Sequence, residues 1–228
     1  MPELQKITID TLIISDIHLG DRLTRCRKIL EVLNNYSYQR LILNGDILNG
    51  LGFKRLHAEH WRILSKFREL SKDCQVVWIH GNHDAAAGIL SHLLGITVHD
   101  KYFWQAAGKK FLAIHGHQFD RFIHNNIILS RLVFFCYGWL KRVNPNGHIV
   151  RLIKRRSHTW ERNSFEVAKG ALRQARAMAA DYVFCGHTHI IDTAEDSGVK
   201  YFNTGSWVEK PSAYVVVAGH EAKLIQVD

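Results

Sequence analysis

The stretch Ile13-Ile14-Ser15-Asp16-Ile17-His18-Leu19-Gly20 decides the fold. Residues 7–14, which lead into it, are apolar and β-branched and predict a buried strand. A carboxylate and an imidazole then follow two residues apart. If the extended conformation persists to His18, Asp16 and His18 point the same way and Ile17 points into the core. Open α/β sheets place their ligands at the carboxyl ends of strands, so this pair is a candidate metal site.

The same arrangement recurs twice in the first half of the chain. Residues 40–43 predict a second strand that runs into Gly45-Asp46, and residues 74–79 predict a third that runs into Gly81-Asn82-His83-Asp84. Apolar residues at helical spacing lie between these strands. Strands that alternate with helices predict parallel βαβ units with right-handed crossovers, so the three loops should meet at one edge of a sheet.

The second half of the chain has a different pattern of strands and turns. The strand expected over residues 110–114 leads into a further histidine, and the strand expected over residues 182–185 ends in Gly186-His187-Thr188-His189. Alternating apolar residues around tight turns predict hairpins over residues 190–203 and 213–227. We therefore expect the second half to be mostly antiparallel and to form a second sheet against the first.

Composition bounds the class of protein. With 228 residues, of which 46% are hydrophobic and 22% charged, the chain is long enough for one large domain with a sizeable core. Its four cysteines are far apart and form no Cys-X-X-Cys pair, which favours a reducing compartment over a disulfide framework. The first residues lack the basic run and the apolar segment of a signal peptide. We expect a cytoplasmic protein, either free or peripheral on the inner face of the membrane.

The net charge of +9 is unevenly distributed, because the sequence between Asp120 and Glu161 holds eight Lys or Arg residues and no acid. Such an excess predicts an anionic partner, which could be a phosphorylated substrate, a membrane surface or nucleic acid. Residues 121–140 are rich in apolar side chains, but polar residues interrupt them too often for a transmembrane helix. We predict that residues 121–165 form a helical insertion that caps the sheet edge, ahead of a helix over residues 166–180. The alternative is an ordinary helical pair with a solvated basic face.

The candidate ligands all lie at or just after the end of a predicted strand. They are Asp16, His18, Asp46, Asn82, His115, His187 and His189. Imidazole and carboxylate ligands without thiolates suit a divalent transition metal such as Mn²⁺, Fe²⁺ or Zn²⁺. Seven ligands exceed what one tetrahedral zinc takes, and they suit two ions roughly 3.5–4 Å apart that share a bridging carboxylate. Such a pair binds phosphoryl oxygens and activates water, which predicts a phosphoester or phosphoanhydride hydrolase.

Five blocks in this order resemble the calcineurin-like metallophosphoesterases. They are Asp16-Ile17-His18, Gly45-Asp46, Gly81-Asn82-His83-Asp84, His115 and Gly186-His187-Thr188-His189. The resemblance implies two ions, with Mn²⁺ as the expected metal and Fe²⁺ or Zn²⁺ as alternatives. The first ion would be held by Asp16, His18, Asp46 and His189, and the second by the bridging Asp46 with Asn82, His115 and His187.

The resemblance also implies catalytic roles and a fold. His83 would contact the phosphate and protonate the leaving group, and Asp84 would orient His83. The implied fold class is α/β (α+β), a four-layer α-β-β-α sandwich of two facing sheets. Residues 1–228 would form this single domain, with the helical cap of residues 121–165 inserted in it.

Within this family the chain is similar to the UDP-2,3-diacylglucosamine diphosphatases of lipid A biosynthesis. The similarity lies in residues 15–20, 115–120 and 203–209, and in the helical insertion after His115. It implies hydrolysis of a pyrophosphate bond to a lipid sugar 1-phosphate and UMP, with acyl chains cradled by the insertion. An apolar stretch joined to a basic one suits a diacyl sugar with a diphosphate, drawn from a membrane surface.

Four positions depart from the pattern of that group. Asp is usual where this chain has His117 and Ser206 and is common where it has Asn49, and one branch has Arg in place of His83. None of these is a predicted metal ligand, so the departures leave the substrate open. One alternative is a broad-specificity phosphoesterase that acts on nucleotides, other phosphodiesters or nucleic acid.

Another alternative is a non-catalytic membrane-binding or scaffold module, against which the intact His83 and metal ligands argue. We expect a lipid-linked nucleotide sugar as the partner rather than nucleic acid, with contact to an anionic membrane surface, and leave the oligomeric state open.

Overall fold

The structure, a computed structural model, describes residues 6–50, 52–120 and 158–228. Its helices are α1 (Cys26–Asn35), η1 (Phe53–Arg55), α2 (Ala58–Leu70), α3 (Ala87–Leu94), η2 (His117–Phe119) and α7 (His158–Ala177). Its strands are β1 (Ile7–Ile14), β2 (Tyr36–Asn44), β3 (Gln75–Ile79), β4 (Val98–His99), β5 (Lys101–Ala106), β6 (Lys109–Ile114), β7 (Tyr182–Cys185), β8 (Ile191–Asp196), β9 (Val199–Thr204), β10 (Ser212–Ala218) and β11 (Glu221–Val227).

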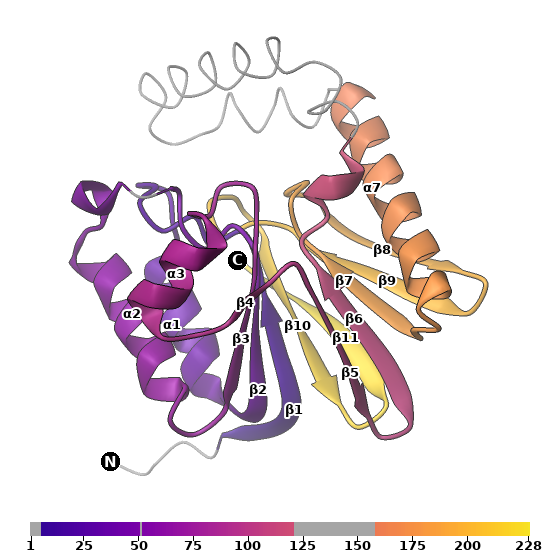
Figure 1. Cartoon of the computed structure of the whole chain (residues 1–228), viewed down its shortest axis with the longest axis horizontal. Helices are drawn as coiled ribbons and strands as arrows, with labels where there is room; N and C mark the ends of the chain where they lie inside the picture. The colour runs from indigo at the N-terminus through magenta and orange to yellow at the C-terminus, as the bar shows by residue number, and fades with distance from the viewer. Residues whose placement is uncertain (1–5, 51, 121–157) are drawn as a thin grey trace.

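The first sheet has the strand order β11-β10-β1-β2-β3-β4 (Figure 1). Strands β1, β2 and β3 run parallel, with Ile14 opposite Leu43 and Asn44 opposite Ile79. Because parallel strands end at the same edge of a sheet, the loops that follow these three strands emerge side by side. The prediction of parallel βαβ units in the first half is therefore confirmed.

The second sheet has the order β5-β6-β7-β9-β8. Strands β6, β7 and β9 pair in parallel, whereas the pairs β5·β6 and β8·β9 are antiparallel. The second half is thus mostly antiparallel, as expected, with β6·β7 and β7·β9 as parallel pairs. The predicted terminal hairpin of β10 and β11 is confirmed, but it joins the first sheet rather than the second, because β10 pairs antiparallel with β1. Strand β10 is apolar and buried on both faces, and such a run does not by itself say which sheet it joins.

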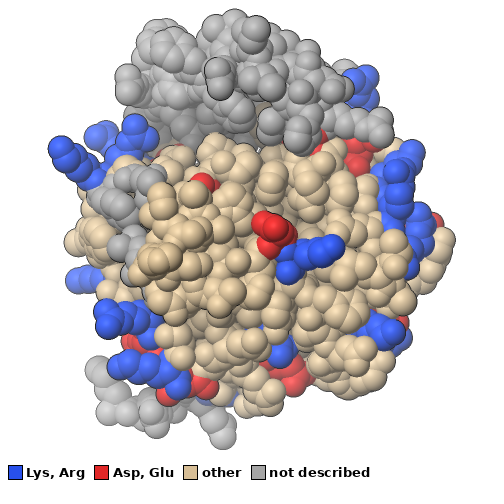
Figure 2. Space-filling model, in the orientation of Figure 1, with Lys and Arg blue, Asp and Glu red and all other residues tan. Residues whose placement is uncertain are grey.

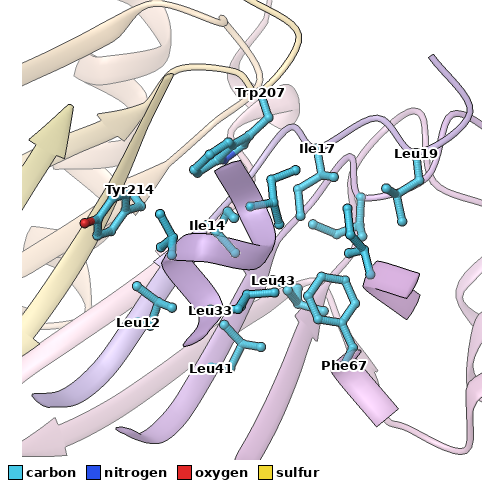
Figure 3. Close-up of a cluster of buried hydrophobic side chains, with 14 of the residues drawn as sticks. Leu12, Ile14, Ile17, Leu19, Leu33, Leu41, Leu43, Phe67, Trp207 and Tyr214 are labelled. Carbon is cyan, nitrogen blue, oxygen red and sulfur yellow. The ribbon is translucent and has the colours of Figure 1, made fainter. Parts of the chain in front are cut away.

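Alternate residues of the central strands face different layers. Leu12 and Ile14 of β1 pack with Phe67 of α2 in the cluster that Figure 3 shows. Ile13 points the opposite way and lies in a second cluster with Phe111 of β6. Both faces of the first sheet are thus buried, which explains why β1 ends as a continuous apolar run.

Aromatic side chains fill the space between the sheets. The rings of Trp104, Phe111 and Phe184 stack with centroids 5.2–6.3 Å apart. On the outer side of the second sheet, Ala171 and Ala175 of α7 lie buried in a third cluster. Figure 1 shows α1, α2 and α3 outside the first sheet and α7 outside the second. The layers are therefore helix, sheet, sheet and helix, and the predicted α/β sandwich is confirmed.

A buried asparagine ties the two sheets together at the edge where the loops emerge. Asn44, the last residue of β2, donates its side-chain amide to the main-chain oxygens of Ile114 and Phe184, both at 3.2 Å. These two oxygens lie near the ends of β6 and β7, and a buried carbonyl without a donor costs about 1–3 kcal/mol. The main-chain oxygen of Asn44 in turn accepts a hydrogen bond from His115 Nδ1 at 2.9 Å. The ends of the two sheets are thereby held at a fixed spacing.

The helix before β7 differs in its bounds from the prediction. It begins at His158 rather than at residue 166, and it ends at Ala177, just before Ala179 takes a left-handed φ of 52°. The predicted insertion over residues 121–165 lies outside the described residues, except that residues 158–165 form the first turns of α7. The insertion and the single domain over residues 1–228 stay predictions.

Charged side chains are unevenly spread over the part of the surface that is described. Lys and Arg gather along both sides of the face shown in Figure 2, with few charges across its middle. The basic run between Asp120 and Glu161 has all its Lys and Arg residues outside the described residues. Among the helices that the structure describes, none combines the length and the hydrophobicity needed to cross a bilayer.

Candidate metal centre

The loops after β1 and β2 stay paired beyond the ends of the strands. The Asp16 N–H donates to the main-chain oxygen of Gly45 at 3.0 Å, and the His18 N–H donates to the main-chain oxygen of Asp46 at 2.9 Å. This continued pairing carries three predicted ligands, Asp16, His18 and Asp46, out of the two strands together. It is the local reason why side chains from separate strands can share one site.

Most predicted ligands have a left-handed main chain. They are Asp16 (φ 50°), His18 (φ 52°), Asp46 (φ 53°), His187 (φ 67°) and His189 (φ 58°). Residues other than glycine seldom adopt this conformation, and where they do the strain is commonly found at binding and active sites. The assumption of an extended chain up to His18 is therefore wrong. Asp16 and His18 converge because both turn left-handed on either side of the buried Ile17.

The first cluster of candidate ligands consists of Asp16, His18, Asp46 and His189, whose ligand atoms all lie within 4.8 Å of one another. His18 Nε2 lies 3.0 Å from His189 Nε2 and 3.9 Å from Asp16 Oδ1. His189 Nε2 lies 3.3 Å from the same carboxylate oxygen. Two imidazole nitrogens and carboxylate oxygens that face a common point can surround a divalent transition metal.

The second cluster consists of Asp46, His115 and His187, so Asp46 belongs to both clusters. Asp46 Oδ2 lies 3.4 Å from His115 Nε2 and 3.9 Å from His18 Nε2. Asn82 adjoins this cluster, with its Oδ1 2.9 Å from His187 Nδ1. The seven predicted ligands are thus brought together, in the same two groups that the resemblance implied.

Two buried polar atoms at the junction of the clusters show that this donor set fits cations. Within the described residues, neither Asp46 Oδ2 nor His115 Nε2 has a hydrogen-bond partner. An unpaired polar atom away from water is costly, and a shared cation would satisfy both. Because the Asn44 main chain holds His115 Nδ1, it is Nε2 that faces the cluster. The donors are compatible with a binuclear site, and they do not distinguish Mn²⁺ from Fe²⁺ or Zn²⁺.

Electrostatics within the clusters favour charged pairs. Burial opposes protonation of His115, but the carboxylates of Asp46 and Asp16 raise its pKa to about 10. Burial likewise opposes ionisation of Asp46, but His115 holds the pKa of that carboxyl well below its usual range. Burial lowers the pKa of His18 to about 3, which leaves its ring neutral. Without ions, the Asp46 carboxylate and a protonated His115 therefore attract each other across 3.4 Å, without a hydrogen bond between them.

Two glycines let the loops approach closely enough to form these clusters. A Cβ at Gly81 would lie 2.2 Å from the main-chain nitrogen of Asp46, and a Cβ at Gly186 would lie 2.1 Å from Asp16 Oδ2. Both distances are far below van der Waals contact, so no larger residue fits without displacing a predicted ligand. Glycine before Asn82 and before His187 is thus a packing requirement.

His83 lies beside the first cluster. Its ring stands edge-on to the His18 ring, with centroids 5.1 Å apart. The main-chain N–H of His83 donates to Asp46 Oδ1 at 2.8 Å. Burial lowers the pKa of His83, so the ring is mostly neutral at neutral pH. An imidazole next to the ligands, and outside both clusters, is placed for the predicted contact with a phosphate.

Asp84 holds the loops after β2 and β3 together. Its carboxylate accepts hydrogen bonds from the main-chain N–H groups of Asp46 (3.0 Å), Leu48 (2.9 Å) and Gly81 (3.0 Å) and from Trp78 Nε1 (3.2 Å). Burial raises the pKa of Asp84 to about 6. The orientation of His83 by Asp84 stays a prediction, and it would run through the loop that carries both residues.

Several polar residues around the centre had no role assigned from the sequence. The Ser15 hydroxyl donates to the Asp16 carboxylate and lies 2.6 Å from Thr204 Oγ1. Ser206 Oγ donates to the main-chain oxygen of Asp16 at 3.3 Å. Asp120 Oδ2 lies 2.8 Å from His187 Nε2. All four residues stand in residues 15–20, 115–120 and 203–209, and this is their only signal in the sequence, because apart from the contact of Ser15 with Asp16 their partners are distant along the chain.

Comparison with known proteins gives a family and a fold. The profile described as the calcineurin-like phosphoesterase superfamily domain matches residues 9–222. A search among curated proteins finds no match.

Three solved structures illustrate the likeness in fold. An archaeal phosphodiesterase is 17% identical, with a TM-score of 0.53, over 95% of this chain and 99% of that one. Vps29 from Chaetomium thermophilum is 10% identical, with a TM-score of 0.54, over 95% and 96% of the two chains. Vps29 from Entamoeba histolytica, solved in complex with zinc, is 17% identical, with a TM-score of 0.50, over 96% and 98%.

Replacing Gly186 by alanine tests the close approach of the loops. We expect Gly186→Ala to lower the free energy of unfolding of the metal-free protein by about 2–4 kcal/mol, because the new Cβ overlaps the Asp16 carboxylate. Urea unfolding followed by circular dichroism measures the change. The matched control is Gly88→Ala, where a Cβ meets nothing within 4 Å and helix propensity improves. Equal stabilities of the two variants would contradict the packing argument.

Ion binding should release protons. The pKa of His115 near 10 means that its ring is protonated at pH 7.5, and a protonated imidazole cannot bind a metal ion. Affinity for Mn²⁺ should therefore rise as pH rises, by about tenfold per pH unit for each proton exchanged. Calorimetric titration in buffers of different ionisation enthalpy counts the protons. The control is His92→Gln, at an exposed position, which should release as many protons as wild type on binding Mn²⁺. Binding without proton release would refute the assignment of His115 as a ligand.

Proposed function

Since this chain belongs to the calcineurin-like phosphoesterase superfamily, we propose that it hydrolyses the pyrophosphate bond of UDP-2,3-diacylglucosamine, giving a lipid sugar 1-phosphate and UMP. Family membership carries the general activity, so the prediction of a metal-dependent phosphoester hydrolase is confirmed. We propose, in addition, the substrate, the identity of the ions and the roles of single residues.

The observation that carries the proposal is where the diphosphatase-like stretches lie. Residues 15–20, 115–120 and 203–209 are far apart in sequence, yet each contacts the predicted metal centre. The Trp207 N–H donates to the main-chain oxygen of Asp16 at 3.0 Å, and Asp120 contacts His187. All three stretches resemble the UDP-2,3-diacylglucosamine diphosphatases and gather around the predicted reaction centre. This supports the proposal that the protein acts on the same substrate as those enzymes.

The chain's own residues would bind and orient the diphosphate. Two divalent ions at such a centre bind phosphoryl oxygens and lower the pKa of a bound water. Asp46 faces both clusters and so fixes their spacing, while His83 lies at the rim of the first. An anionic phosphate beside His83 favours the protonated ring, which offsets the effect of burial. His83 can then donate a proton to the departing phosphate oxygen.

A second candidate is a broad-specificity phosphoesterase acting on nucleotides or other phosphodiesters. Two of the departures from the diphosphatase pattern lie at the predicted centre: the His117 ring is 5.6 Å from the His115 ring, and Ser206 hydrogen-bonds the Asp16 main chain. The archaeal structure with the same fold is described as a phosphodiesterase. These features favour the second candidate over a substrate recognised by its acyl chains.

The proposed substrate implies a location. A diacylated nucleotide sugar resides at a membrane, and a segment with eight Lys or Arg residues and no acid suits an anionic lipid surface. We therefore propose a cytoplasmic enzyme that contacts the inner face of the membrane peripherally.

A panel of phosphate compounds tests the substrate. Mn²⁺-loaded protein is assayed with UDP-2,3-diacylglucosamine, UDP-N-acetylglucosamine, bis-p-nitrophenyl phosphate and single-stranded DNA. We expect kcat/KM for the diacylated substrate to exceed the others by orders of magnitude, because binding energy from acyl chains far from the reacting bond can stabilise the transition state. Comparable turnover of the small diester would favour the broad-specificity candidate. No turnover by protein holding both ions would overturn both.

His83→Ala should reduce kcat by roughly 10²–10⁴-fold, the usual contribution of a general acid. Two ions should still bind, because His83 belongs to neither cluster of candidate ligands. Steady-state kinetics and metal analysis of the same preparation measure the two effects. The control is His92→Ala, an exposed histidine on α3 that should be active. Undiminished turnover by His83→Ala would remove His83 from the mechanism.

A further inference from the structure

Both ring nitrogens of His187 have a close polar neighbour. Nε2 lies 2.8 Å from Asp120 Oδ2, and Nδ1 lies 2.9 Å from Asn82 Oδ1. A carboxylate oxygen only accepts hydrogen bonds, so the contact with Asp120 requires a proton on Nε2. The neutral ring then carries its lone pair on Nδ1, on the side of Asn82, which is the predicted ligand of the same ion.

Asp120 is itself held in a buried position. Only 3% of its surface is exposed, and its Oδ2 also accepts a hydrogen bond from Asn163 Nδ2 at 2.7 Å. Its main-chain N–H donates to the oxygen of His117 at 3.1 Å. One carboxylate oxygen thus joins His187 to Asn163. Hydrogen bonds to a charged acceptor are stronger and more directional than neutral ones, so Asn163 restricts where this oxygen can lie.

Helix α7 presents Asn163 from a fixed place. Trp160 Nε1 donates to the main-chain oxygen of Thr188 at 2.8 Å, which locks the first turns of α7 against the loop after β7. Further along, α7 packs so closely on η2 that a Cβ at Gly170 would lie 2.5 Å from the Phe119 ring. The helix, the Asp120 segment and the loop of His187 therefore form one packed unit.

We propose that Asp120 and Asn163 are positioning residues of the second ion site. Asp120 holds His187 in the tautomer whose Nδ1 lone pair faces the ion, and Asn163 holds the Asp120 carboxylate in place. Neither residue touches the reacting atoms, and their effect runs through His187. The inference rests on the proposed dimetal function and adds to it a carboxylate and an amide to which no role was assigned.

Metal binding and ring spectroscopy together test this inference. In full-length protein titrated with Mn²⁺, Asp120→Ala should weaken one of the two ions roughly 10- to 100-fold and leave the other unchanged. Asn163→Ala should weaken the same ion by a smaller factor. Asp120→Asn keeps an oxygen acceptor and should recover part of the loss. Nitrogen NMR of the Zn²⁺-loaded protein should show His187 protonated on Nε2 in wild type, and a lost preference in Asp120→Ala.

Asp181→Asn is the matched control. This carboxylate also accepts two hydrogen bonds, from Lys109 Nζ at 3.0 Å and the Lys110 N–H at 2.8 Å, but it belongs to neither ligand cluster. It should cost stability without changing affinity for either ion. If Asp120→Ala does not fold, Asp120→Asn and Asn163→Ala decide the matter.

Two outcomes would overturn the inference, and they are distinguishable. If the variants of Asp120 and Asn163 bind both ions as tightly as wild type and keep the His187 tautomer, the positioning role is wrong while the dimetal function stands. If wild-type protein saturated with Mn²⁺ holds fewer than two ions, the dimetal function fails and the positioning role fails with it.

Discussion

Two separate sheets must bring their carboxyl-terminal edges within hydrogen-bonding distance, and every other feature of the centre depends on this. Apolar burial between the layers is strong but non-directional, so it cannot set such a spacing. Buried hydrogen bonds can: the Asn44 amide reaches carbonyls at the ends of β6 and β7, and its own carbonyl receives His115. The result is a carboxylate from one sheet, Asp46, within 3.4 Å of an imidazole from the other.

This convergence is electrostatically demanding in the absence of cations. Asp16 and Asp46 are both buried, and each carboxylate disfavours ionisation of the other. The fold compensates with imidazoles, and the raised pKa of His115 shows how strongly the acids hold a proton there. A divalent ion can take the place of such protons, and a ligand that binds only the folded state stabilises that state. Folding and ion binding are therefore linked processes in this protein.

Much of the fold and of the centre could be predicted from local sequence, for a physical reason. A buried parallel strand is a continuous apolar run, and the candidate ligands follow directly at its end. The sequences of β1, β2 and β3 therefore predict both the sheet and the site. Features that depend on distant partners could not be predicted in this way. The sheet joined by β10 is one, since a strand that is apolar on both faces fits the middle of either sheet. The left-handed turns at Asp16 and His18 are another, because those side chains do not favour that conformation by themselves. The contact of Asp120 with both Asn163 and His187 required α7 to be in place.

Strand β1 is completed by β10, which lies about two hundred positions later in the chain. While the protein is being synthesised, β1 and β2 leave the ribosome long before β10 exists. During that interval β1 has an open edge, and unpaired apolar edges are prone to pair with other chains. The last main-chain contact of the Asp16 loop, from Trp207, is also missing until then. Assembly of the centre therefore has to wait until Trp207 and β10 have been synthesised.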